Sequence, residues 1–152
     1  MQIRLAETSD FEGACALYRQ LGGKLAVLEG VDGKARWQEL LNHQGSFVFV
    51  GDDNRFITSI ISLHLLPNMT NMGRPYAMIE NVVTDSEHRG KGIGRKVMQA
   101  AIEYAWEKNA YKIMLLTGKD REDGGAVGFY ERLGFRGDEK HAMTMRKVPP
   151  RS

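Results

Sequence analysis

Glycines and positive side chains are concentrated in residues 89–96, which read RGKGIGRK. The apolar run at 76–84 precedes this segment and an apolar stripe at helical spacing follows it, so we predict a strand, a glycine loop and a helix that begins near Gly92. Carboxylates are favoured at a helix N-terminus, because its N–H groups are unpaired and carry partial positive charge. Here four cations crowd that end instead: Arg89, Lys91, Arg95 and Lys96. A bound phosphate or pyrophosphate would explain the cations and the glycines, whereas a tight turn with a solvated basic surface is the alternative.

The absence of certain motif residues from this segment narrows the choice of phosphate-containing ligand. A nucleotide-binding P-loop ends in Gly-Lys-Ser/Thr, and residues 94–96 read GRK, which disfavours ATP or GTP hydrolysis. A dinucleotide fingerprint needs its third glycine one residue after Gly94, where the chain has Arg95. Asp120 could still imitate the acidic residue that binds a ribose, so an NAD(P)-dependent oxidoreductase stays open as an alternative.

Residues 89–94 resemble the Arg/Gln-x-x-Gly-x-Gly/Ala signature of the GNAT family of N-acetyltransferases, which hold the pyrophosphate of acetyl-CoA at such a turn. Residues 79–83 (IENVV) and 129–135 (FYERLGF) also resemble that family, and the element order extends the similarity over nearly the whole chain. The resemblance implies acetyl-CoA as co-substrate and no metal. It also implies cofactor contacts from Val82, Val83, Thr84, Arg89, Gly90, Lys91, Gly92, Ile93, Gly94 and Arg95.

Acyl transfer to an amine needs a base, an oxyanion donor and an acid for the departing thiolate. Glu80 lies among apolar residues, so we expect burial to raise its pKa and make it the base, a role that it matches in the family. A carboxylate on a solvated face of the sheet, or one paired with a core arginine, is the alternative. The resemblance implies a bulge near Asn81 and Val82 that separates this strand from the next, so that pantetheine can pair with it. Tyr130 matches the family's usual acid, and a phenol pKa of about 10 suits a thiolate of about 8.5. Asp123 stands where the family often has Asn, so contacts there are in question, and Lys119 and Arg121 could reach the cofactor phosphate or the acceptor instead.

The elements around these residues predict a mixed α/β fold, a largely antiparallel sheet flanked by helices in the order βααβββαβαβ, in one domain over residues 1–152. Ser9 and Glu12 are spaced as a capping box at the start of the first helix. The strand before the glycine loop and the strand after its helix should be parallel. The predicted strands are 2–6, 47–50, 55–66, 76–84, 111–117 and 141–146, and the predicted helices start near residues 9, 32, 92 and 125.

Composition limits the remaining possibilities. The chain has 152 residues and a net charge of +2, too balanced for a protein that coats nucleic acid or an anionic membrane. The single cysteine, Cys15, and the lack of an apolar N-terminal segment or membrane-length run lead us to expect a cytoplasmic protein.

The amine that accepts the acetyl group is the part of the function that the sequence determines least. Residues 79–83, 111–115 and 129–135 are similar to the branch that acetylates glucosamine 6-phosphate, although Asn81 replaces that branch's usual Asp. We therefore expect a small-molecule amine, such as an amino-sugar phosphate, and a homodimer, with Arg74, Lys112 and Lys140 as candidates to neutralise a phosphate. A protein or peptide N-acetyltransferase and a non-catalytic acyl-CoA-binding module are the alternatives.

Overall fold

The computed structural model describes residues 1–22, 27–118 and 126–147. It divides into two compact units, Met1–Leu115 and Leu116–Ser152. The single domain expected from the sequence stays a prediction.

The first unit is built on a five-stranded sheet whose strands follow their order in the chain. They are β1 (Gln2–Leu5), β2 (Ser46–Asp52), β3 (Ile57–Leu66), β4 (Tyr76–Thr84) and β5 (Ile113–Leu115). Neighbouring strands are antiparallel from β1 to β4, while β4 and β5 are parallel. The central strand β3 is buried from Ile57 to Leu63, as expected for a strand covered on both faces. The predicted mixed α/β fold is confirmed, and β4 has its predicted bounds.

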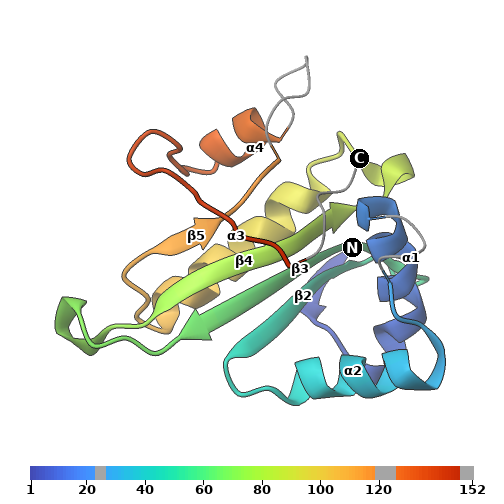
Figure 1. Cartoon of the computed structure of the whole chain (residues 1–152). Helices are drawn as coiled ribbons and strands as arrows, with labels where there is room; N and C mark the ends of the chain where they lie inside the picture. The colour runs from blue at the N-terminus through green and yellow to red at the C-terminus, as the bar shows by residue number, and fades with distance from the viewer. Residues whose placement is uncertain (23–26, 119–125, 148–152) are drawn as a thin grey trace. The chain divides into compact units, whose positions relative to one another are not determined.

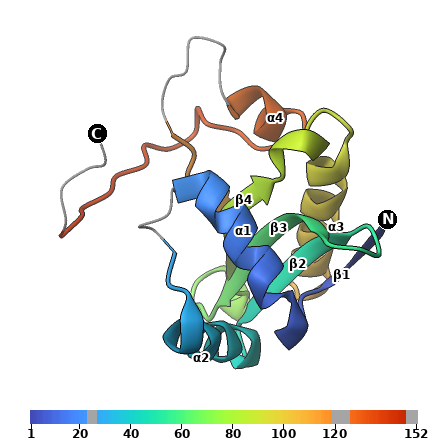
Figure 2. The same cartoon turned by 90° about the vertical axis from the view of Figure 1, so that its right-hand side faces the viewer.

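Helices cover the two faces of this sheet (Figures 1 and 2). On one face, α1 (Phe11–Gly22) and α2 (Gly30–Asn42) pack Phe11 and Trp37 into a core with Val48 and Val50 of β2. On the other face, α3 (Ile93–Glu107) places the ring of Tyr104 4.7 Å from that of Phe47. Side chains of a strand alternate between faces, so each strand residue can be assigned to the α1/α2 face or to the α3 face.

The start of α1 differs from the prediction. A short 3-10 turn, Thr8–Asp10, precedes the helix, and Asp10 Oδ2 accepts a hydrogen bond from the Glu7 amide at 2.7 Å. The capping box predicted from Ser9 and Glu12 is therefore wrong, because the extra turn places Asp10 where it can cap. Burial alone would raise the pKa of Asp10, but two hydrogen bonds from Arg4 and the one from Glu7 hold it below its usual value.

The second unit contains the short helix α4 (Val127–Glu131). The strand predicted at 141–146 is wrong, because residues 141–147 pair with no strand in the described part of the chain and an unpaired segment gains no ladder hydrogen bonds. Within the described residues no helix is long and apolar enough to cross a membrane.

Candidate functional site

A β-bulge interrupts β4 next to Glu80. Val83 is paired with Ile60 of β3 and Glu80 with Ser62, so that Asn81 and Val82 together face the single residue Ile61. Asn81 adopts the left-handed conformation with φ 54°, which a bulge residue can require. The bulge that the family resemblance implied is thereby confirmed.

Beyond the bulge, no strand in the described part of the chain pairs with β4 on its β5 side. Pairing with β5 covers only Ala77, Met78 and Ile79, while β4 continues to Thr84. The Asp85 amide donates to the carbonyl of Thr58 at 2.8 Å, and backbone groups alternate along a strand. The amides of Val82 and Thr84 therefore point away from β3, toward the β5 side of β4. The amide of Val83 points toward β3. This edge can accept an extended ligand as an additional strand.

The loop between β4 and α3 owes its shape to two glycines. Gly90 and Gly92 have φ of 74° and 75°, a region that other residues enter at a cost of about 1–2 kcal/mol. A Cβ at either position would meet no atom within 4 Å, so backbone conformation rather than space requires glycine here.

The N-terminus of α3 is open and positively charged. Gly92 offers no side-chain cap and the first turn contains no acidic residue. The amide of Lys96 makes the first helical bond, to the carbonyl of Gly92, which leaves the amides of residues 93–95 as the usual unpaired donors of a helix start. Arg89 Nε donates to the Thr84 carbonyl and Lys91 Nζ to the Glu87 carbonyl, each at 3.0 Å. This is the geometry of an anion site.

Glu80 is exposed, and its predicted burial is wrong. The prediction rested on the apolar neighbours of Glu80 in the sequence, but the side chains of a strand alternate. Ile79 is buried on the α3 face, while Glu80 points to the α1/α2 face beside Ser62. Its carboxylate is therefore free to reach a substrate.

Two buried hydroxyl groups, one of them on Ser62 opposite Glu80, were missed by the sequence analysis. Ser62 is 1% exposed. Among the described residues, neither its Oγ nor the buried phenol oxygen of Tyr18 on α1 has a hydrogen-bond partner. Burial raises the pKa of Tyr18 to about 12, and the proximity of Ser62 opposes that rise without forming a well-aligned hydrogen bond. Only the register of β3 against β4 could have indicated Ser62, because no motif in the local sequence distinguishes it from the other residues of the strand.

Tyr130, the candidate acid, belongs to α4 in the second unit. Its ring lies 5.2 Å from that of Phe129 and 6.1 Å from that of Phe135. The Phe135 amide donates to the Tyr130 carbonyl at 3.1 Å, which folds the segment 130–135 back on itself. Burial raises the pKa of the Tyr130 phenol, so it keeps its proton at neutral pH.

A model of the Acetyltransferase (GNAT) family matches residues 26–135. The chain belongs to this family. Over 142 residues it is 30% identical to the glucosamine 6-phosphate N-acetyltransferase of Trypanosoma brucei brucei, covering 92% of each chain. It is 39% identical to N-alpha-acetyltransferase 30 of Schizosaccharomyces pombe over 59% of this chain and 57% of that protein. A solved structure from Agrobacterium tumefaciens is similar with a TM-score of 0.89, 37% identity and coverage of 97% and 100% of the two chains.

Membership of the GNAT family makes the chain an acyltransferase, and enzymes of this family use acetyl-CoA. The matched region includes the β4 bulge, the glycine loop and α4. Among the described residues, no group of three or more His, Cys, Asp or Glu side chains is placed to hold a metal ion. Asp123, Lys119 and Arg121 lie outside the described residues.

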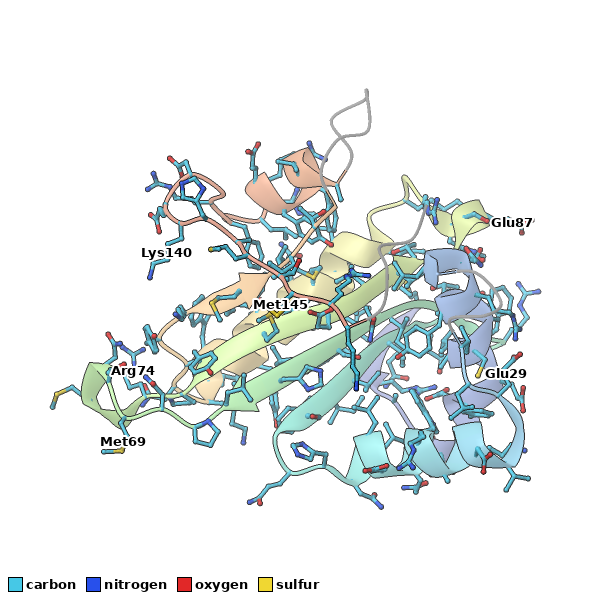
Figure 3. All side chains as sticks on the ribbon, viewed as in Figure 1. Glu29, Met69, Arg74, Glu87, Lys140 and Met145 are labelled. Carbon is cyan, nitrogen blue, oxygen red and sulfur yellow. The ribbon has the colours of Figure 1, made fainter. Side chains whose placement is uncertain are left out.

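Two of the cations considered for an acceptor phosphate in this GNAT chain have other contacts. Arg74 donates to the carbonyls of Asn109 and Ala110, at 3.2 and 3.1 Å, and Figure 3 shows it near the β3–β4 turn, at the other end of β4 from Glu87. Lys112 Nζ lies over the rings of Tyr76 and Tyr111. Both therefore lie near the start of β4, about 13 Å along the strand from Glu80 at 3.3 Å per residue. Lys140 is exposed in the second unit.

Proposed function

We propose that this GNAT protein transfers an acetyl group directly from acetyl-CoA to the primary amine of a small molecule. The observation that carries the proposal is the combination of a bulged β4, whose pairing with β5 ends at Ile79, with an acid-free and cation-rich N-terminus of α3. The first feature fits pantetheine and the second fits a pyrophosphate, and acetyl-CoA contains both.

This geometry supports the cofactor contacts that we propose. Backbone amides from Gly90 to Arg95 would bind the pyrophosphate, with Arg89, Lys91 and Arg95 supplying charge. The backbone groups of Val82 and Thr84 would pair with pantetheine, while Val83 contributes its side chain to the core and its backbone to the β3 pairing. An amide at the bulge would face the thioester oxygen and stabilise the oxyanion that forms on attack.

Two side chains would move the protons. The Glu80 carboxylate takes the proton from the attacking amine, and the Tyr130 phenol gives its proton to the departing CoA thiolate. Transfer takes place within one complex of both substrates, because this arrangement requires no acetylated side chain. Cys15 is buried in the core, which is consistent with direct transfer.

A small amine is the acceptor that the comparisons favour, because the relative that covers 92% of both chains is named a glucosamine 6-phosphate N-acetyltransferase. The positions of Arg74 and Lys112 give an acceptor phosphate no counter-charge near Glu80. An acceptor phosphate would thus depend on other cations, and Lys140 remains one candidate. A peptide acceptor is the second possibility, because the chain also resembles a protein named N-alpha-acetyltransferase 30.

Thermal shift with acetyl-CoA and with NADPH tests the cofactor. Stabilisation by acetyl-CoA alone is expected, because a ligand that binds only the folded state raises its stability. A panel of glucosamine 6-phosphate, glucosamine, L-methionine sulfone, spermidine and a short peptide then tests the acceptor, by release of the free CoA thiol. Binding of acetyl-CoA without thiol release from any amine would favour a non-catalytic module, and stabilisation by NADPH instead would reject the proposal.

A further inference from the structure

A chain of three polar side chains connects the end of α2 to β3. His43 caps the C-terminus of α2, Ser46 begins β2 and is paired with His64 of β3. The Ser46 hydroxyl lies 3.0 Å from Nδ1 of His43 and 2.8 Å from Nδ1 of His64. The turn that carries His43 and Ser46 is fixed to β3, because the Leu65 amide donates to the Gly45 carbonyl at 2.7 Å.

The hydrogen bonds determine which nitrogen of each ring carries a proton. The Gly45 amide donates to Nδ1 of His43 at 3.3 Å, so that nitrogen presents a lone pair. The Ser46 hydroxyl must then donate to the same nitrogen, since two lone pairs would repel at 3.0 Å. Its single hydrogen is now used, so the 2.8 Å contact is a donation from Nδ1–H of His64 to Ser46. Neutral His64 therefore presents a basic lone pair at Nε2.

His64 and Glu80 occupy the same face of the sheet. His64 is paired with Met78, two residues before Glu80, which is the diagonal relation in which long side chains on adjacent strands interact. Burial lowers the pKa of His64, and of the groups acting on the ring, Glu80 of β4 opposes this shift and His43 of the turn adds to it. His64 is thus neutral at pH 7 and able to accept a proton.

We propose that His64 is a proton-relay residue for Glu80, held in the required tautomer by Ser46 and His43. This rests on the proposed role of Glu80 as base. The amine loses its proton to the Glu80 carboxylate as the new C–N bond forms, and the resulting carboxylic acid passes that proton to Nε2 of His64. The imidazolium, still donating through Nδ1 to Ser46, then releases the Nε2 proton to water. Glu80 is returned to its carboxylate form and every proton is accounted for.

NMR of the imidazole nitrogens in the whole protein, without substrate, tests the assignment independently of acetyl transfer. We expect the Nδ1–H tautomer for neutral His64 and the Nε2–H tautomer for neutral His43. Glu80→Gln should lower the pKa of His64, whereas Glu103→Gln, on the exposed side of α3, should not change it. The proposal is overturned if neutral His64 is the Nε2–H tautomer, or if Glu80→Gln leaves the pKa of His64 unchanged. Either result would do so even if the protein is an active acetyltransferase.

Kinetics with acetyl-CoA and the amine that is turned over fastest in the panel above test the relay itself. His64→Gln should lower kcat about tenfold near pH 7 with little change in the KM for acetyl-CoA, and added imidazole should restore part of the rate. Ser46→Ala should give a smaller loss and a mixture of His64 tautomers. His141→Gln, at an exposed position of the second unit, is the matched control and should leave kcat unchanged. A loss of kcat that imidazole does not restore, or an unchanged kcat in His64→Gln, overturns the relay. Failure of every amine to react would instead reject the proposed function, with the NMR result unaffected.

Discussion

The glycine loop with the start of α3 and the sheet face around Glu80 are built in opposite ways. The loop is contiguous: residues 84–96 supply its turn, its positive φ angles and its cations. The face around Glu80 is assembled from α1, β2, β3 and β4, and its members Tyr18, Ser46, Ser62 and His64 are separated by up to 62 residues from Glu80. A site made from one segment can be read in the sequence, whereas a site made from four segments depends on register.

The largest expected effect is on the face around Glu80. Glu80→Gln keeps the shape of the side chain and removes its ability to accept a proton, so kcat should fall about 100-fold near pH 7. The loss should diminish at high pH, where the amine is already uncharged. Glu103→Gln is the control, and acetyl-CoA affinity should stay constant in both variants. A pH–rate profile of Glu80→Gln that overlays the wild type would remove Glu80 from the mechanism.

The next effect tests the loop. Gly92→Val must hold a β-branched residue at φ 75°, a strain of about 1–2 kcal/mol that corresponds to roughly a tenfold change in an equilibrium constant. We expect the loop to leave this conformation and the Kd for acetyl-CoA to rise about tenfold. Gly92→Asn is the matched variant, because Asn enters the left-handed region more easily, and its Kd should change less. The Kd of each variant can be measured by calorimetry. If Gly92→Val and Gly92→Asn raise it equally, the positive φ angle is not the reason that glycine is needed at this position.

The same contrast explains how much the sequence could predict. The bounds of β4, the start of α3 and the parallel pairing of β4 with β5 were correct, because periodicity and glycines act locally. The bulge came from family resemblance alone. The predicted burial of Glu80 was wrong because its apolar neighbours in the sequence lie on the opposite face of the strand. The predicted strand at 141–146 was wrong because a strand forms only where another strand pairs with it, and the local sequence does not show whether a partner is present.

The residues that were missed share one physical reason. Ser62 and His64 appear in the sequence as ordinary members of a buried strand. Their importance arises only when β3 is aligned with β4, which brings Ser62 opposite Glu80. A shift of one residue would move both to the other face of the sheet. The α1 cap was missed for a local reason instead, because the short turn Thr8–Asp10 places Asp10 within reach of the Glu7 amide.

A smaller effect is expected where the two regions meet. Gln20 of α1 donates through Nε2 to Asp85 at 2.8 Å and accepts from the Ser86 amide at 2.9 Å, which ties the helix to the loop. Gln20→Leu removes both bonds, at about 0.5–1.5 kcal/mol each, part of which is regained as hydration. The KM for acetyl-CoA should rise a few-fold while kcat is retained, and Gln99→Leu, on the exposed side of α3, is the control. A fall in kcat at constant KM would place Gln20 with the acceptor face instead.

This link also has a pH dependence. Hydrogen bonds from Gln20 and then His88 hold the pKa of Asp85 below its usual value. Because the pKa of Asp85 is lower in the folded state than in the unfolded state, its ionised form stabilises the folded protein. This stabilisation is complete above the unfolded-state pKa of about 3.9 and is lost as the pH falls through the folded-state pKa. In Gln20→Leu the folded pKa moves back up, so the stability difference between variant and wild type should shrink below pH 4, as urea unfolding would measure.

The smallest expected effect concerns Tyr18. Its hydroxyl is buried beside Ser62 with no hydrogen-bond partner in the part of the chain that the structure describes, so Tyr18→Phe removes a desolvated polar group and leaves the ring packing intact. The free energy of unfolding should stay constant or rise by up to about 1 kcal/mol. Because burial raises the pKa of Tyr18 to about 12, the phenol is neutral at working pH and this result should not vary between pH 6 and 9. Leu17→Ala on the same helix, which opens a cavity, is the contrasting control and should cost about 2–5 kcal/mol. A loss of more than 1 kcal/mol in Tyr18→Phe would instead mean that the two hydroxyls bind a buried water, and that the face around Glu80 contains a polar network that the loop lacks.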